Sequence, residues 1–140
     1  MPLEPQQIDL IRESFDVLKK NPNRRSVEFY QAFFARAPEV KGMFREDLEG
    51  QGMRFLTTLS LIVGHLDRPE AIDSRLEELG HTHRAMGVTP EQFGPMGEAL
   101  IEVLENALGE GFTAEARKAW EAGFAEISQF VIAKGGIGAD

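Results

Sequence analysis

Hydrophobic residues recur at helical spacing along almost the whole chain. In the first segment, Ile8, Ile11, Phe15 and Leu18 fall on one side of a helix. The same three- and four-residue spacing returns at about 27–37, 51–62, 71–85, 90–108 and 114–134. No segment shows the alternating pattern of a half-buried strand. The pattern therefore predicts an all-α protein.

Proline, glycine and capping residues divide these segments. Pro5 can open the first helix, "KNPN" ends it, and Pro38 bends the chain into a short segment that ends near Phe44. Thr89 and Thr113 are suited to cap the last two long helices, and 109–111 separates them. Seven or eight helices result. They could form a plain bundle, or they could cross around a cofactor pocket.

The length of 140 residues suits one domain, 1–140. The glycine-rich end "AKGGIGAD" predicts a flexible tail from about residue 135. With 15 basic and 23 acidic residues, the net charge of −8 argues against nucleic acid or an anionic membrane as the main partner. No apolar run reaches the length of a membrane span, and the N-terminus lacks a signal-peptide pattern. We expect a soluble, cytoplasmic protein.

The chain has no cysteine, which excludes disulfides, thiolate metal sites and cysteine nucleophiles. Candidate chemistry lies instead in the histidines of "LEELGHTHRAMGV". On a helix His81 and His83 point about 200° apart, so they cannot hold one ion together. His83 shares the apolar face of Ile72, Leu76 and Leu79, whereas His81 lies on the polar face. His83 is therefore either a buried histidine with one hydrogen bond or a ligand to a metal or cofactor.

Two further polar residues lie on apolar faces. Tyr30, the only tyrosine, could simply pack and bond a backbone carbonyl, or it could serve a site. Gln51 could be an exposed residue at a helix start, or it could face the same site. A glycine inside a helix, such as Gly52, lowers the stability of that helix relative to alanine. A close crossing with the preceding helix near Ser26 would explain why this position has no side chain. His65 and His81 are expected at the surface.

Four segments, "EFYQAFFARAPEVKGMF", "LEGQGMRFLTTL", "LGHTHRAMGV" and "AWEAGF", together resemble a bacterial single-domain globin. The kinship is nearest to the haem domain of flavohaemoglobins and extends from about Leu10 to Lys134. The resemblance implies a globin fold of seven to eight helices around a pocket for haem b. It also implies that His83 is the proximal ligand to the iron.

The resemblance assigns other residues as well. Tyr30 and Gln51 match the distal residues that stabilise a bound gas. Arg54 matches a basic residue that can meet a haem propionate. The remaining implied haem contacts are Phe44, Phe55, Leu79, Val88, Phe93 and Met96.

The chain also departs from the family pattern. Flavohaemoglobins pair the proximal histidine with a tyrosine and a glutamate, but Phe93 and Gly135 stand at these positions here. The Nδ1 proton of His83 is therefore expected to meet a backbone carbonyl near Leu79. This weakens the case for peroxidase-like chemistry.

The implied function is reversible binding of O2, together with CO and NO, with tight O2 binding through Tyr30 and Gln51. Two alternatives stay open. One is a nitric oxide dioxygenase that depends on an external reductase. The other is a haem-based gas sensor module that acts through a partner. The expected assembly is a monomer or a weak homodimer.

Overall fold

The computed structural model describes residues 3–43 and 48–138, and every regular element within these ranges is helical. The prediction of an all-α protein is therefore confirmed for these residues. The long helices are α1 (Pro5–Leu18), α2 (Pro22–Arg36), α3 (Leu48–Gly64), α4 (Asp73–Ala85), α5 (Phe93–Leu108) and α6 (Ala114–Gly135). Four short 3₁₀ helices connect them: η1 (Pro38–Met43), η2 (Pro69–Ile72), η3 (Pro90–Gln92) and η4 (Gly109–Gly111).

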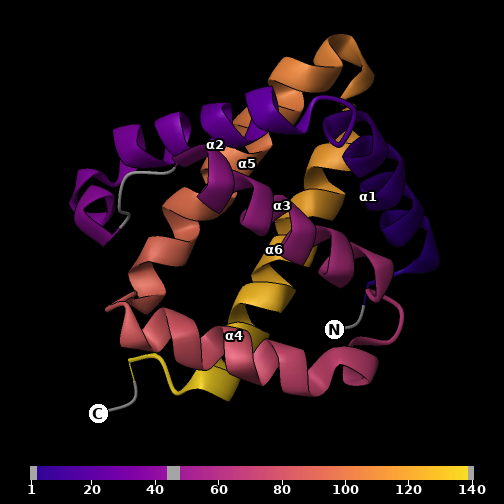
Figure 1. Ribbon diagram of the computed structural model, residues 1–140. Coiled ribbons are helices and arrows are strands. Elements are labelled where there is room, and N and C mark those ends of the chain that lie inside the picture. Colours follow the sequence, from indigo (N-terminus) through magenta and orange to yellow (C-terminus); the bar gives the residue numbers. More distant parts are fainter. Residues whose placement is uncertain (1–2, 44–47, 139–140) are drawn as a thin grey trace.

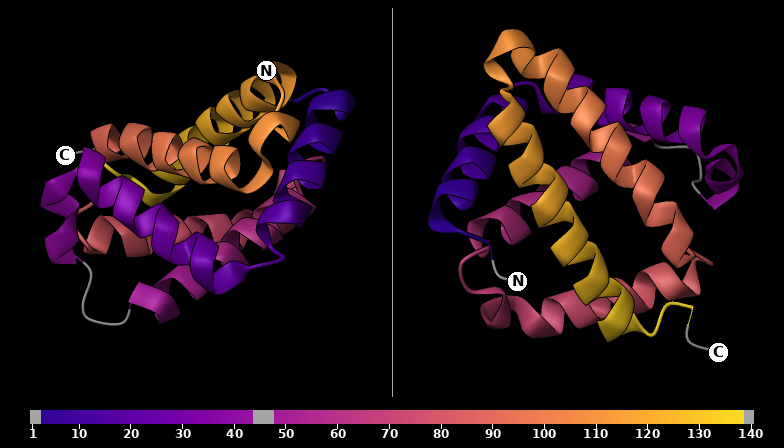
Figure 2. Two further views of the ribbon diagram at one scale, coloured as in Figure 1. Left: turned by 90° about the horizontal axis from the view of Figure 1, so that it is seen from above. Right: turned by 180° about the vertical axis from the view of Figure 1, so that it is seen from behind.

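The helices cross at steep angles instead of lying side by side as in a plain bundle. Figure 1 shows α5 and α6 behind α2 and α3, with α4 running across the lower edge. Viewed from above in Figure 2, these helices form two layers, and α1 lies at one end. Helix α2 packs on α3 and α5, while α6 packs on α1 and α4. Of the two architectures left open by the sequence, the described helices therefore adopt the crossed one.

The predicted apolar faces form the core. All four residues of the α1 stripe are buried, from Ile8 at 6% exposed to Leu18 at 0%. Trp120 is also buried, and its indole N–H donates to Ser14 Oγ over 2.7 Å. A second cluster joins α4 to α5 and α6 through Leu76, Phe93 and Val131. These two clusters hold the helices in the crossed arrangement.

The glycine in the third helix lies at a close crossing, as the sequence predicted. A Cβ on Gly52 would stand 2.2 Å from the Cβ of Ser26, closer than two carbon atoms can approach. Without a side chain at this position, α3 can lie directly against α2. As a result Phe55 stacks on Phe29, with ring centroids 4.2 Å apart and planes 9° from parallel.

The C-terminal segment corrects one expectation. Gly135 is buried, and Ile137 is only 4% exposed and belongs to the second core cluster. The amide of Ile137 donates to the carbonyl of Ile132 over 3.0 Å, and Gly136 adopts the left-handed conformation with φ 65°. This glycine-closed turn brings an apolar side chain back onto the core. The packed structure therefore continues at least to Ile137, past the start of the expected tail.

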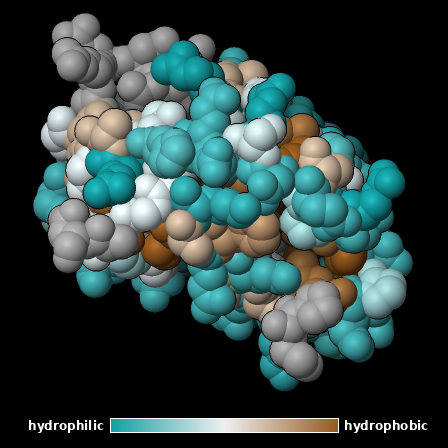
Figure 3. Space-filling model, turned by 90° about the horizontal axis from the view of Figure 1, so that it is seen from below, coloured by the Kyte–Doolittle hydropathy of each residue, from teal (hydrophilic) through white to brown (hydrophobic). Residues whose placement is uncertain are grey.

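The face seen from below is largely hydrophilic, with hydrophobic side chains showing mainly in hollows between polar ones (Figure 3). Across the described ranges, Met86 is the one large hydrophobic residue that is well exposed, at 40%. Among the described helices, none combines the length and the apolar character that a membrane crossing requires.

Candidate cofactor site

A cavity of about 440 Å³ lies between α2 and α3 on one side and α4, α5 and α6 on the other. This volume is within the usual range for a small-molecule or cofactor site. Its wall is overwhelmingly apolar, so the cavity favours a ligand with a large hydrophobic surface. Eight of the residues singled out from the sequence line it: Tyr30, Arg54, Phe55, Leu79, His83, Val88, Phe93 and Met96.

His83 lies in the last turn of α4, and hydrogen bonds fix both its backbone and its ring. The amide of Val88 donates to the His83 carbonyl over 3.1 Å, and the amide of Gly87 donates to the Arg84 carbonyl over 3.0 Å. Gly87 has φ 88°, so the two bonds form the glycine-dependent Schellman end of a helix. The imidazole Nδ1 lies 2.8 Å from the carbonyl oxygen of Leu79, as the sequence analysis expected.

A carbonyl oxygen can only accept a hydrogen bond, so Nδ1 of His83 carries the proton. The other ring nitrogen, Nε2, then has a lone pair for a ligand. No group of three or more His, Asp or Glu side chains that could hold an ion occurs within residues 3–43 and 48–138. A single imidazole on an apolar wall suits a metal that arrives with its own macrocyclic ligand.

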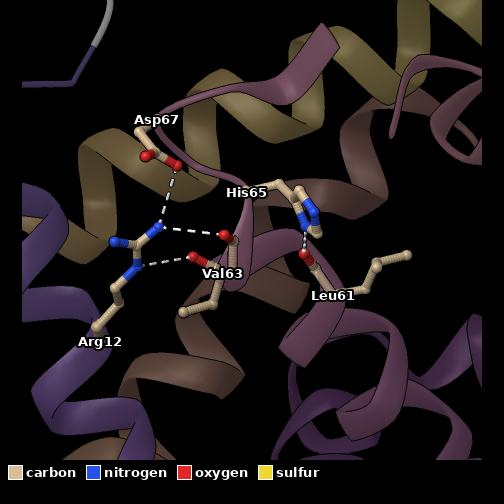
Figure 4. A network of polar contacts seen from close by, with 6 residues as sticks. Arg12, Leu61, Val63, His65 and Asp67 are labelled. Carbon is tan, nitrogen blue, oxygen red and sulfur yellow. Dashed lines mark hydrogen bonds and ion pairs between the residues drawn. The ribbon is translucent and has the colours of Figure 1, made fainter. Parts of the chain in front are cut away.

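The other two histidines do not line the cavity. His81 is exposed on the outer face of α4, as predicted. His65 was expected at the surface, but it is half-buried beyond the end of α3, and its Nδ1 lies 2.8 Å from the Leu61 carbonyl oxygen. Figure 4 shows its neighbourhood, in which Arg12 reaches the Val63 carbonyl and the Asp67 carboxylate. These contacts join α1 to the end of α3.

Tyr30 faces the cavity from α2 and is only 5% exposed. Burial raises the pKa of its hydroxyl from 10.0 to about 12, although the positive charge of Arg54 opposes this shift. The hydroxyl is therefore neutral near pH 7 and can donate a hydrogen bond. Its ring packs edge-on against Phe29, with centroids 5.0 Å apart.

Because Tyr30 is the only tyrosine, alkaline titration of phenolate absorbance reports on it alone. We expect a midpoint near 12 in the folded protein and near 10 after unfolding in denaturant. Between these values the folded state binds more protons than the unfolded state. The free energy of unfolding is thus undiminished below pH 10 and falls by up to about 3 kcal/mol as pH rises towards 12. A folded-state midpoint at 10 would contradict the buried position.

Two of the predicted site residues cannot be placed. Phe44 lies outside the described residues. Gln51 belongs to α3, one turn before Phe55, but its side chain is also outside the described part of the structure. Their roles stay predictions from the resemblance.

The structure shows the surroundings of Phe93 and Gly135, the two residues near His83 that depart from the family pattern. The ring of Phe93 is 7% exposed and stacks beside His83, with centroids 6.0 Å apart. Gly135 packs against Gly80 of α4, and a Cβ at residue 135 would stand 2.4 Å from the Gly80 carbonyl carbon. Residue 135, where the family resemblance implies a glutamate in flavohaemoglobins, therefore has no room for a side chain here.

Sequence reasoning missed several residues of the cavity wall. Thr82 and Met86 flank His83 on α4, and Met43 ends η1. Gln92 is buried at 8% exposed, and its Oε1 accepts the amide of Thr89 over 3.0 Å. The motif "TPEQ" does predict this local capping bond. Its spacing carries no signal that Gln92 also reaches the cavity, because that depends on how η3 meets α4.

Comparison with known proteins agrees with the family resemblance of the sequence. A family model described as Globin matches residues 27–131. A neuroglobin from Tetraodon nigroviridis is 32% identical over 127 residues, which cover 80% of this chain and 79% of that protein. A flavohemoprotein from Vibrio cholerae is 26% identical over 137 residues, which cover 96% of this chain and 35% of that protein. The chain thus spans about a third of the length of the flavohemoproteins that it matches.

Among solved structures, a bacterial globin from Campylobacter jejuni superposes with a TM-score of 0.83 at 26% sequence identity. The superposition covers 95% of this chain and 96% of that one. The overall helix arrangement is therefore shared over nearly the full length of both.

Proposed function

This chain belongs to the globin family, and we propose that it holds haem b through His83 and reversibly binds dioxygen in the cavity that Tyr30 faces. Membership of the family implies a haem cofactor and a gaseous ligand. The proposal adds the residues that hold and tune them. The observation that carries it is the imidazole of His83, held by Leu79 on the wall of an apolar cavity.

The residues around the cavity fit such a group. Haem is a wide apolar disc with two carboxylates on one edge, and bound haem supplies a ferrous iron that takes up diatomic gases. His83 would hold the iron through Nε2, because its Nδ1 bonds the Leu79 carbonyl. Phe55 and Phe93 supply flat apolar walls that exclude water. Arg54 is exposed where it lines the cavity, which suits contact with a carboxylate.

On the ligand side, the neutral hydroxyl of Tyr30 can donate to the partly charged oxygen of a dioxygen ligand. Gln51 is proposed as a second donor, since it lies on α3 one turn before Phe55. Two donors in a dry pocket favour slow release of O2. This points to scavenging or sensing more than to rapid delivery.

Nitric oxide dioxygenation is the second candidate, favoured by the flavohemoprotein match over 96% of this chain. Conversion of NO and O2 to nitrate takes one electron from the ferrous protein in each turnover. A reductase would have to return that electron. Steady NO consumption by the protein with an added reductase and NADH would support this activity, while a single stoichiometric oxidation would support gas binding alone.

Absorption spectra of the ferric, ferrous and CO-bound protein test the main proposal. We expect the ferrous form to be five-coordinate, because among residues 3–43 and 48–138 no histidine other than His83 lines the cavity. CO should then produce a sharp shift of the Soret band. The variants His65→Ala and His81→Ala serve as controls and should give the same spectra. A protein that retains no haem, or a ferrous spectrum of two strong-field nitrogen ligands, would contradict the proposal.

A further inference from the structure

Helices α4 and α6 touch through their backbones at two glycines. A Cβ on Gly80 would lie 2.6 Å from the carbonyl oxygen of Val131 and 2.7 Å from the Cα of Gly135. A Cβ on Gly135 would lie 2.4 Å from the carbonyl carbon of Gly80. Figures 1 and 2 show the C-terminal end of α6 crossing α4 at close quarters from two opposite sides. Any side chain at either position would force these two backbones apart.

The crossing lies beside the acceptor that orients the cavity histidine. Gly80 directly follows Leu79, whose carbonyl oxygen is 2.8 Å from Nδ1 of His83. His83 itself is three residues further along the same helix. The stretch of α4 that fixes the imidazole is therefore the stretch that rests on the backbone of α6.

Contacts on both sides of the crossing hold α6 against α4. At the start of α4, Asp73 pairs with Lys134 over 2.7 Å. Near the end of α4, a guanidinium nitrogen of Arg84 comes within 3.0 Å of where a Cβ on Gly136 would stand. Beyond α6, the buried side chain of Ile137 anchors the chain to the second core cluster. The end of α6 is thus supported along the length of α4.

We propose that Gly80 and Gly135 are positioning residues for His83: their backbone contact sets how far α4 stands from α6, and so where the imidazole lies in the cavity. This inference rests on the proposed function. To bring a Cβ at residue 135 to ordinary contact distance, the two backbones must separate by about 1 Å. The neighbouring atoms are backbone and not the tip of a flexible side chain, so the strain moves the helix.

The test compares Gly135→Ala with Gly97→Ala. A Cβ on Gly97 of α5 would lie 2.8 Å from the ring of Phe124, which also lines the cavity. This control therefore adds the same methyl group at another tight contact with α6 and disturbs the cavity wall without touching the Gly80–Gly135 crossing. We expect both haem-loaded variants to keep a Soret band and to lose stability. Only Gly135→Ala should shift the iron–histidine stretching band in the resonance Raman spectrum of the ferrous protein.

A second readout uses the haem-free protein. Proton NMR of the His83 Nδ1–H follows its bond to Leu79 without any cofactor. We expect its exchange with solvent to be about 10-fold faster in Gly135→Ala than in the unaltered chain, which corresponds to about 1.4 kcal/mol. The exchange rate in Gly97→Ala should stay unchanged.

The outcomes separate this inference from the proposed function. An unaltered protein without an iron–histidine band would refute the proposed function. An unaltered protein with that band, together with a Gly135→Ala variant that leaves both the band and the exchange rate unchanged, would overturn only the positioning role. Equal changes in Gly97→Ala would overturn it too. If Gly135→Ala and Gly80→Ala both fail to fold while Gly97→Ala folds, the contact serves folding and the positioning role is again refuted.

Discussion

Replacement of His83 by alanine is expected to speed haem dissociation by more than about 100-fold, so that no stable Soret band survives purification. Loss of a partner that only supports a metal ligand commonly costs 10- to 100-fold in affinity, and loss of the ligand itself costs more. The variant leaves no other histidine on the wall of the cavity within the described residues. Haem transfer to an excess of an apoprotein acceptor measures the dissociation rate.

The control is His81→Ala, two residues away on the same helix. His81 is exposed, whereas His83 lines the cavity, so the two substitutions differ mainly in which face they alter. We expect His81→Ala to dissociate haem at the rate of the unaltered protein. Equal loss of haem in both variants would mean that helix α4 was damaged, and the assignment of His83 would not stand.

The local pattern of the sequence was enough to find the helices and the inward face of the histidine helix, whereas most of the cavity-wall residues were assigned only by the family resemblance. The side chain of His83 could be assigned to the inward face of its helix because Leu76 and Leu79 mark that face. The glycine at position 52 predicted a close crossing with Ser26, which the structure confirms. Each of these inferences depends on residues a few positions apart, or on one strong steric requirement. The roles of Tyr30 and Gln51, by contrast, came only with the family resemblance.

Features that depend on distant contacts could not be predicted in the same way. Ile137 follows two glycines near the chain end, a context that suggests fraying, yet it is buried because α4 and α5 offer it an apolar surface. His65 is half-buried in the connection where α3 ends beside α1. The helix expected from Ala71 begins at Asp73, since Pro69–Ile72 form the tighter turn η2. For Ile137 and His65 the deciding neighbour lies elsewhere in the chain, whereas the start of α4 is set by the turn directly before it.

The same distinction applies to the proximal side of the cavity. The family resemblance implies that Gly135 stands at the position of an acidic residue, but the sequence does not reveal why a side chain is absent. In the structure the reason is steric, because the α6 backbone at Gly135 rests on Gly80. A substitution Gly135→Glu would therefore separate the helices before it could supply a carboxylate to His83.

Loss of either distal donor is expected to speed O2 dissociation by roughly 10- to 100-fold. A hydrogen bond to a partly charged acceptor in a dry pocket contributes about 1.5–3 kcal/mol, and about 1.4 kcal/mol corresponds to one decade in rate. The Tyr30 hydroxyl remains protonated because burial raises its pKa to about 12, so it can donate a hydrogen bond throughout the physiological range. Stopped-flow measurement of O2 release from Tyr30→Phe, Gln51→Leu and the double variant provides the rates.

The effects of the two substitutions should be non-additive if each side chain orients the other. The O2 dissociation rate of the double variant should then rise by less than the product of the two single-variant increases. CO is a much weaker hydrogen-bond acceptor than O2, and its affinity should change far less in all three variants. Thr57→Val is the matched control, since Thr57 lies on the exposed face of α3 and its hydroxyl is bonded to the Met53 carbonyl. Rates that stay at the unaltered value in all three distal variants would show that the donors lie elsewhere, and the argument for a tight-binding pocket would fail with them.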